Sequence, residues 1–242
     1  MTGGASDRRR PLNPQNLDAL ELWYDIELTY GSNAIEGGTL SRREIAIVFE
    51  NGVAAGDKPL KDRLEAIGHR DALRLVRALV RAGKRLRESD IRELHRLIAV
   101  RTDPGQAGRY AWHRPVIAGA PIAPPSPAEI PALMAEFADW LATAPAGPET
   151  AFAAHARLIA INPFVGGNGR VARLVMNLVL IRAGYPPVVI GPEHRAAYID
   201  ALQALQLRSD PGPYRRFMAE RLEASLDRHP ALLEGVRPPC AG

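Results

Sequence analysis

Apolar residues along most of the chain recur at the spacing of α-helices, and the alternation that marks β-strands is nearly absent. The pattern predicts helices at 15–30, 41–51, 60–82, 88–99, 127–143, 149–161, 169–183, 192–208 and 212–227. One segment differs: 116–125 alternates weakly, carries Gly119 near its centre and ends in two prolines, so we expect a short hairpin at an edge. The predicted class is therefore all-α, a helical bundle with one short β-hairpin.

The helix predicted at 169–183 is apolar nearly all round, which indicates a buried central helix. Gly184 and the Pro186–Pro187 pair are expected to end it. The Ala/Pro/Gly stretch 143–148 reads as a short linker. We expect a single structural domain over 15–234, with disordered ends at 1–14 and 235–242.

A glycine-rich turn opens this central helix. Its glycines are Gly166, Gly167 and Gly169. Such a turn lets backbone N–H groups converge on an anion, and the helix N-terminus adds unpaired N–H groups and partial positive charge. Arg170 and Arg173 stand at i and i+3, so both side chains can reach the same end of the helix, where arginine suits phosphate. The alternative is an ordinary loop-to-helix junction with two solvated arginines.

The run from Asn162 to Arg173, Asn-Pro-Phe-Val-Gly-Gly-Asn-Gly-Arg-Val-Ala-Arg, resembles the signature of the Fic (Fido) family, His-Pro-Phe-x-Asp/Glu-Gly-Asn-Gly-Arg-x-x-Arg. Asn162 stands at the position of the catalytic histidine, and Gly166 at that of the metal-binding carboxylate. The resemblance implies a Fic-type bundle and a nucleotide site. The residues expected to bind nucleotide or phosphate are Gly167, Asn168, Gly169, Arg170, Arg173 and Tyr198.

The segment from Ser32 to Gly37, Ser-Asn-Ala-Ile-Glu-Gly, resembles the inhibitory motif of self-restrained Fic proteins. The resemblance implies that Glu36 pairs with Arg173 and blocks the γ-phosphate position. It extends over roughly 15–207, with N-terminal helices, including the inhibitory helix, at 15–100 and a Fic core with the flap and phosphate motif at 101–234.

The two departures bear directly on chemistry. An asparagine cannot accept the proton that the family histidine takes from a target hydroxyl, and general-base help is typically worth about 10²–10⁴-fold. Gly166 offers no side-chain oxygen, so we expect no protein-held metal, and Mg²⁺ through the nucleotide phosphates alone. The candidate replacement bases are His155, His113 and Glu36, with a satisfied core histidine and a solvent-exposed loop residue as the alternatives for the two histidines.

We therefore predict a protein that binds ATP or a related nucleotide and resembles protein AMP-transferases, with activity lost, weak or altered. The alternatives are an enzyme with a changed nucleotide-dependent reaction, conventional AMP transfer with substrate-assisted deprotonation, and a non-catalytic interaction module. A protein target is expected at the flap, by strand addition.

Composition narrows the class further. The net charge of +4 and the pI of about 9.5 suit a phosphate ligand, but the arginines are spread along helices, which argues against nucleic acid. The single cysteine, Cys240, excludes a disulfide framework and fits a reducing compartment. With no apolar run of membrane-spanning length and no signal core, we expect a cytoplasmic protein; the sequence allows a homodimer.

Overall fold

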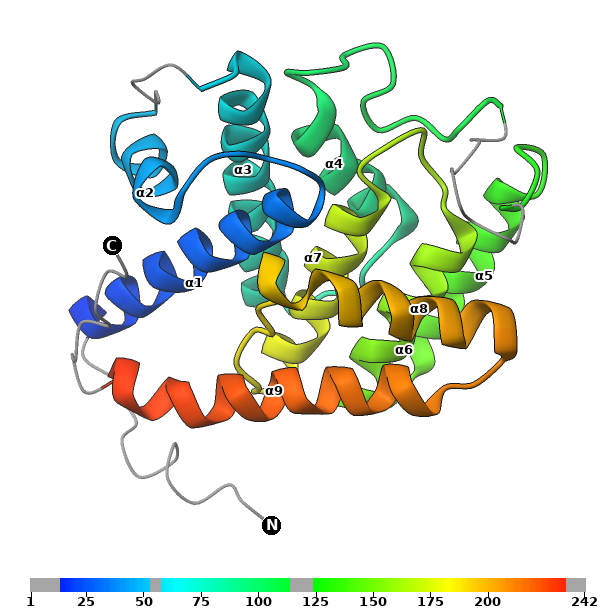
Figure 1. The fold of residues 1–242 in the computed structure, drawn as a ribbon. Coiled ribbons are helices and arrows are strands. Elements are labelled where there is room, and N and C mark those ends of the chain that lie inside the picture. Colours follow the sequence, from blue (N-terminus) through cyan, green and yellow to red (C-terminus); the bar gives the residue numbers. More distant parts are fainter. Residues whose placement is uncertain (1–13, 53–57, 114–123, 234–242) are drawn as a thin grey trace.

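The computed structural model describes residues 14–52, 58–113 and 124–233, which fold into the helical structure of Figure 1. The helices are α1 (Pro14–Ile35), α2 (Arg42–Asn51), α3 (Leu60–Ala82), α4 (Glu88–Ala99), α5 (Ile130–Thr143), α6 (Pro148–Ile161), α7 (Asn168–Arg182), the 3₁₀ turn η2 (Pro192–His194), α8 (Arg195–Arg208) and α9 (Gly212–Leu233). Within these three described ranges there is no strand, so the all-α prediction is confirmed. Most of the hairpin expected at 116–125 lies outside the described residues, as do the expected disordered ends.

The helices match the predicted ones in order, and most ends agree within a few residues. The largest differences are at α1 and α9, which run to Ile35 and Leu233 instead of ending at 30 and 227. Gly31 lies inside α1 and does not end it. Glycine is needed there for close packing of α1 on another segment. A Cβ at this residue would lie 2.4 Å from the backbone oxygen of Ile190, so glycine lets α1 pass close to the segment after α7.

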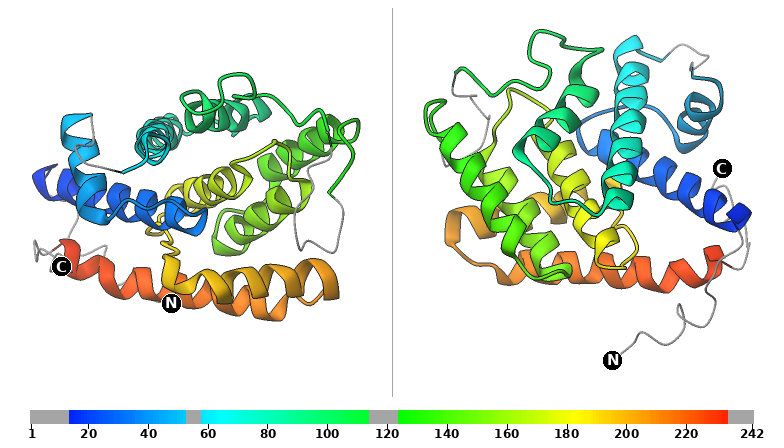
Figure 2. Two further views of the ribbon diagram at one scale, coloured as in Figure 1. Left: turned by 45° about the horizontal axis from the view of Figure 1, so that its top comes forward. Right: turned by 180° about the vertical axis from the view of Figure 1, so that it is seen from behind.

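Helix α7 is the buried centre of the fold, as predicted. One set of its side chains, including Val175 and Leu178, joins the hydrophobic cluster that α3, α4, α5 and α6 share. Met176 and Leu180 instead join a second cluster with α8 and α9. Figure 2 shows the consequence: α7 lies between the α3/α4 pair and the α8/α9 pair. Burial of each large apolar side chain contributes about 1.5–3 kcal/mol, so the packing fixes α7 rigidly.

The ends of α7 are also defined by the backbone. At the C-terminal end, Gly184 adopts φ 82° and the N–H of Tyr185 donates to the oxygen of Leu180 at 3.0 Å, so the predicted glycine stop is confirmed. At the N-terminal end, Gly167 adopts φ 74°, and the first intrahelical bond runs from Val171 N to its oxygen at 3.0 Å. Packing and termini together hold the start of α7 in one place.

Over the described ranges, no helix combines the length and the apolar character that crossing a bilayer requires.

Candidate functional site

The turn 162–167 connects α6 to α7, and side chains hold it closed. Asn162 ends α6 in the left-handed conformation (φ 49°, ψ 56°), which asparagine tolerates better than most residues. Asn168 bridges the turn twice: its Oδ1 accepts from Phe164 N at 2.9 Å, and its Nδ2 donates to Phe164 O at 2.7 Å. The Asn168 side chain therefore shapes the turn.

The start of α7 leaves backbone N–H groups without helical partners, as every helix N-terminus does. Because Val171 N makes the first bond of α7, the N–H groups of Asn168, Gly169 and Arg170 have no partner within the helix. A Cβ at Gly169 would lie 2.6 Å from Glu36 Oε1 and 3.0 Å from Arg173 Nη1. Glycine at this position thus keeps the backbone open to whatever occupies the end of the helix.

The pairing of Glu36 with Arg173 occurs as the resemblance implies. Glu36 follows the last residue of α1, and its Oε1 accepts from Arg173 Nη2 at 2.8 Å. The arginine side chain is buried (6% exposed), whereas the glutamate side chain is 41% exposed. Ser32 contributes as well, because its Oγ accepts from Arg173 Nε at 2.9 Å and its backbone oxygen accepts from Nη2 at 3.1 Å. The carboxylate therefore lies at the solvent side of an arginine that α1 already holds.

The two arginines of the turn diverge, which the i, i+3 spacing did not predict. Arg170 turns towards α3, where its Nη1 lies 3.3 Å from Oε1 of Glu65, and both side chains are nearly buried. Lys61, one turn earlier on α3, is 4.0 Å from the same carboxylate oxygen. Each arginine thus has a carboxylate partner from a different N-terminal segment. The resemblance implied the partner of Arg173, whereas nothing in the sequence indicated that of Arg170.

His95 of α4 lies against the turn, a position that the sequence analysis did not predict. Its ring stacks on Phe164 with centroids 3.8 Å apart. Gly108 N donates to its Nδ1 at 3.0 Å, so Nε2 carries the hydrogen and donates to Gly166 O, also at 3.0 Å. Burial lowers the pKa of His95 to about 4, so the ring is a neutral support for the turn.

Two of the candidate replacement bases can now be placed. His155 is fully buried in α6, and both of its ring nitrogens are 2.8 Å from tyrosine hydroxyls, those of Tyr198 and Tyr214. It is the satisfied core histidine of the two interpretations, and the base role was wrong. His113 lies on the surface, where its ring meets that of Trp112 edge-on with centroids 4.5 Å apart. Tyr198, expected near the nucleotide, is buried behind Arg173, with its hydroxyl 3.5 Å from Nη1.

Metal-binding side chains do not cluster at the described site. Among the residues that the structure describes, no three or more His, Cys, Asp or Glu side chains gather in a way that could hold a metal ion. Gly166 is exposed, and a Cβ added to it meets no atom within 4 Å. There is space for a carboxylate at this position but no carboxylate. The residues present do not fit a protein-held Mg²⁺.

Two cavities lie near the site, and neither is lined by residues of the turn 162–167. One of about 110 Å³ lies between α1, η2 and α9, with Trp23, Arg42 and Arg228 among its lining residues. A smaller one of about 10 Å³ lies directly behind Arg173, beside Ser32 and His69. The site at the start of α7 is thus separate from both cavities, and the side chains of its two arginines are largely buried.

Several known proteins are similar in sequence to most of this chain. The model of the Fic/DOC family matches residues 85–180. Protein adenylyltransferase Fic of Aedes aegypti is 35% identical over 207 residues, which cover 84% of this chain and 41% of that protein. The chain thus spans about two fifths of the length of the curated relatives it matches.

Solved structures extend the likeness to the whole fold. A Fic domain-containing signaling protein from Bacteroides thetaiotaomicron superposes with a TM-score of 0.85 at 30% identity, covering 96% of this chain and 94% of that one. Fic-1 from C. elegans superposes with a TM-score of 0.84 at 31% identity, covering 96% of this chain and 70% of that one. With a relative of this identity matched over nearly its full length, the chain belongs to the Fic/DOC family.

Proposed function

We propose that this protein binds an ATP-type nucleotide at the start of α7, and that the AMP transfer of its relatives is lost or altered in it. The observation that carries the proposal is the contact between Glu36 and Arg173 beside the open N-terminus of α7. A carboxylate that takes one N–H of a buried arginine at this end occupies a place that suits a phosphate oxygen. The relatives named protein adenylyltransferase support a nucleotide as the ligand.

The chemistry is proposed to be impaired because neither departure has a replacement in the described site. Asn162 has no basic nitrogen. Of the other candidate bases, Glu36 is bonded to Arg173, and His113 lies at the surface beside Trp112. Without a base, the hydroxyl that attacks the α-phosphorus keeps its proton until late, and pyrophosphate leaves more slowly. Mg²⁺, if it enters, is carried by the phosphates and positioned by them.

Calorimetric titration of ATP, with and without Mg²⁺, into the wild type and Glu36→Gly tests the nucleotide proposal. We expect tighter binding to the variant, because the substitution removes the carboxylate that competes for Arg173. Glu149→Gly is the matched control: it removes an exposed carboxylate from the first turn of α6, about 20 Å along that helix from the turn. Unchanged affinity in Glu36→Gly would exclude the inhibitory role, and no binding to either protein would exclude the nucleotide.

A second candidate function, AMP transfer that is dormant for want of two side chains, is favoured by the local geometry. Histidine tolerates the left-handed conformation of Asn162, and the space at Gly166 accepts a carboxylate. Asn162→His with Gly166→Asp should therefore gain AMP transfer, with about 10²–10⁴-fold from the base. The readout is the mass gain of one AMP on the protein or on a lysate target. A double variant that binds ATP yet transfers nothing would refute the idea.

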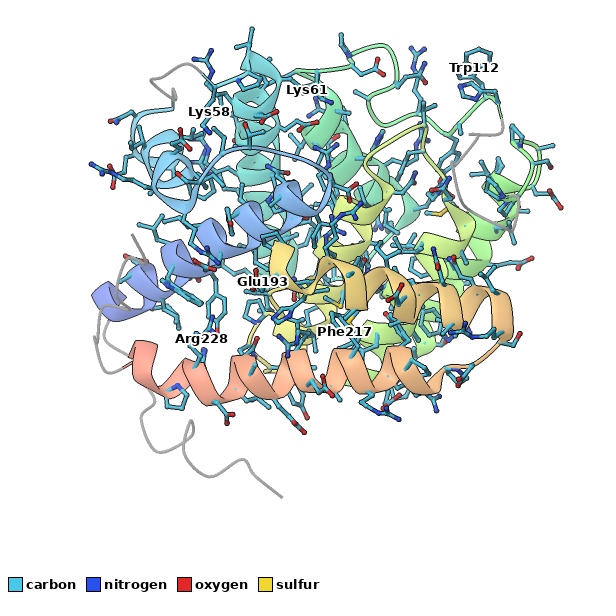
Figure 3. The ribbon with its side chains drawn as sticks, viewed as in Figure 1. Lys58, Lys61, Trp112, Glu193, Phe217 and Arg228 are labelled. Atoms are coloured by element: carbon cyan, nitrogen blue, oxygen red, sulfur yellow. The ribbon has the colours of Figure 1, made fainter. Side chains whose placement is uncertain are left out.

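We also propose a protein partner at the flap, 116–125. Trp112, four residues before it, is 71% exposed and projects from the surface (Figure 3). Large exposed aromatic residues are enriched at protein interfaces. Crosslinking of a partner to the flap, lost in Trp112→Ala, is the expected result; a crosslink that is indifferent to this substitution would count against the proposal.

A further inference from the structure

A line of buried side chains continues from Arg173 into the core. Tyr198 of α8 contacts the arginine, His155 of α6 contacts Tyr198, and Tyr214 of α9 contacts His155. The exposed fractions of Tyr198, His155 and Tyr214 are 2%, 0% and 2%, so water does not compete for these hydrogen bonds. The three side chains come from three different helices around α7, namely α8, α6 and α9 (Figure 1).

The hydrogen bonds of this line can run in one direction only. The Tyr214 hydroxyl donates to the backbone oxygen of Phe152 at 2.9 Å, so towards His155 it can only accept. His155 Nδ1, 2.8 Å away, must then carry the ring hydrogen. Burial, and secondarily the charge of Arg173, lower the pKa of His155 to about 3, so the ring is neutral and Nε2 is an acceptor. The Tyr198 hydroxyl therefore donates to Nε2, also at 2.8 Å.

We propose that this relay commits the Tyr198 hydroxyl hydrogen to His155, makes Tyr198 a fixed acceptor for Arg173, and so positions the guanidinium for an anion whether or not Glu36 is present. Tyr198, His155 and Tyr214 are then positioning residues. The part of the inference that concerns the anion rests on the nucleotide site proposed above; the direction of the hydrogen bonds does not.

The donor inventory of Arg173 shows what the relay achieves. Its guanidinium has five N–H groups. Ser32 Oγ and the Ser32 backbone oxygen take one each, Tyr198 takes one from Nη1, and Glu36 takes one from Nη2. If Glu36 leaves, three bonds from α1 and α8 still hold the guanidinium. An anion then gains the released N–H and the fifth one without any need to reorient the arginine. Tyr198 thus serves the site through Arg173, because its own hydrogen is not available to a phosphate.

The direction of the relay is tested by ¹⁵N NMR of the histidine side chains in the whole chain. We expect His155 to be neutral at pH 7 and protonated at Nδ1. Tyr214→Phe removes the acceptor for that hydrogen, so the variant should shift towards the Nε2–H tautomer. Tyr185→Phe is the matched control, because Tyr185 packs on the same hydrophobic cluster outside the line. His155 protonated at Nε2 in the wild type would overturn the proposal, whatever the protein binds.

The positioning role is tested on Arg173 itself, without nucleotide. Hydrogen exchange of its Nε–H should accelerate in Tyr198→Phe by about tenfold, the effect of losing one bond to a charged group. Tyr214→Phe should accelerate the exchange less than Tyr198→Phe does. This second variant remains informative if Tyr198→Phe does not fold. Exchange that is unchanged in both variants would refute the positioning role.

ATP affinity then separates the two proposals. In the Glu36→Gly background, adding Tyr198→Phe should weaken ATP binding by about tenfold, and adding Tyr185→Phe should leave it unchanged. Faster exchange of the Arg173 Nε–H in Tyr198→Phe, together with unchanged ATP affinity, would refute a role of Tyr198 in anion binding. If Glu36→Gly binds no ATP, the nucleotide proposal and this part of the inference both fail, and the NMR results still decide the relay.

Discussion

Acidification should destabilise this fold before its carboxylates titrate, because three buried imidazoles surround the two arginines. Burial is the main cause that lowers their pKa values: to about 3 for His69 and His155, and to about 4 for His95. The nearby guanidinium charges of Arg170 and Arg173 add to the effect. Each ring is also used as a neutral hydrogen-bonding group; His69 Nδ1, for example, lies 2.8 Å from Thr29 Oγ1.

The sign and size of the effect follow from linkage. An unfolded histidine binds its proton below a pKa of about 6.5, whereas these three rings stay neutral in the folded state until pH 3 to 4. Their contribution to the free energy of unfolding is therefore complete above pH 6.5 and falls as the pH is lowered towards 4. At pH 5 the contribution of each histidine to the free energy of unfolding is lower by about 2 kcal/mol than above pH 6.5. For the three together the loss is about 6 kcal/mol, which is comparable to the whole stability of many domains.

Urea unfolding at pH 8, 6.5, 5.5 and 5 measures this dependence. The slope of the free energy against pH should approach the uptake of three protons on unfolding near pH 5. His69→Gln should lower that slope by about one proton, because it removes one of the three titrating groups. A slope below one proton in the wild type between pH 6 and 5 would refute the argument, since the rings would then be protonated in the folded state as well.

Three further predictions concern single backbone positions. Gly169→Ala should break the contact between Glu36 and Arg173, because its Cβ would lie 2.6 Å from the carboxylate oxygen; unlike Glu36→Gly, it should gain no ATP affinity in calorimetry, since the methyl group blocks the start of α7. Asn162→Ala should lower the free energy of unfolding by about 1 kcal/mol, and Asn162→Gly should not, because the residue is left-handed; equal urea midpoints for the two would contradict this. Gly68→Ala should cost about 3 kcal/mol or more in the same assay, because its Cβ would lie 2.7 Å from a backbone oxygen of α4; a cost below 1 kcal/mol would mean that α3 moves away easily.

The helices and the central position of α7 could be predicted because both are encoded locally. Periodicity places the helices, and the apolar circumference of 169–183 identifies the buried one. The contact of Glu36 with Arg173 could be predicted as well, but only through resemblance, because the two residues are 137 positions apart in the sequence and no local pattern joins them.

The partners of Arg170 and the roles of His95 and His155 could not be predicted, because each depends on which helices meet. In the sequence, Glu65 looks like any acidic residue of an amphipathic helix. Only the packing of α3 on α7 brings it to Arg170. His95 and His155 look alike as lone histidines on apolar faces. Their hydrogen-bond partners, a loop oxygen in one case and two tyrosines in the other, separate a support of the turn from a member of the relay.

The left-handed residue at the end of α6 has an implication for how such a protein changes over evolutionary time. The backbone at position 162 has a positive φ, which histidine, asparagine and glycine tolerate better than most residues. Position 166, four residues later, faces open space, so packing does not restrict its side chain. Selection for a stable fold therefore restricts position 162 to side chains that tolerate positive φ and leaves position 166 unrestricted. A lineage can exchange asparagine for histidine at 162, or glycine for a carboxylate at 166, through a few codon changes while the scaffold stays intact.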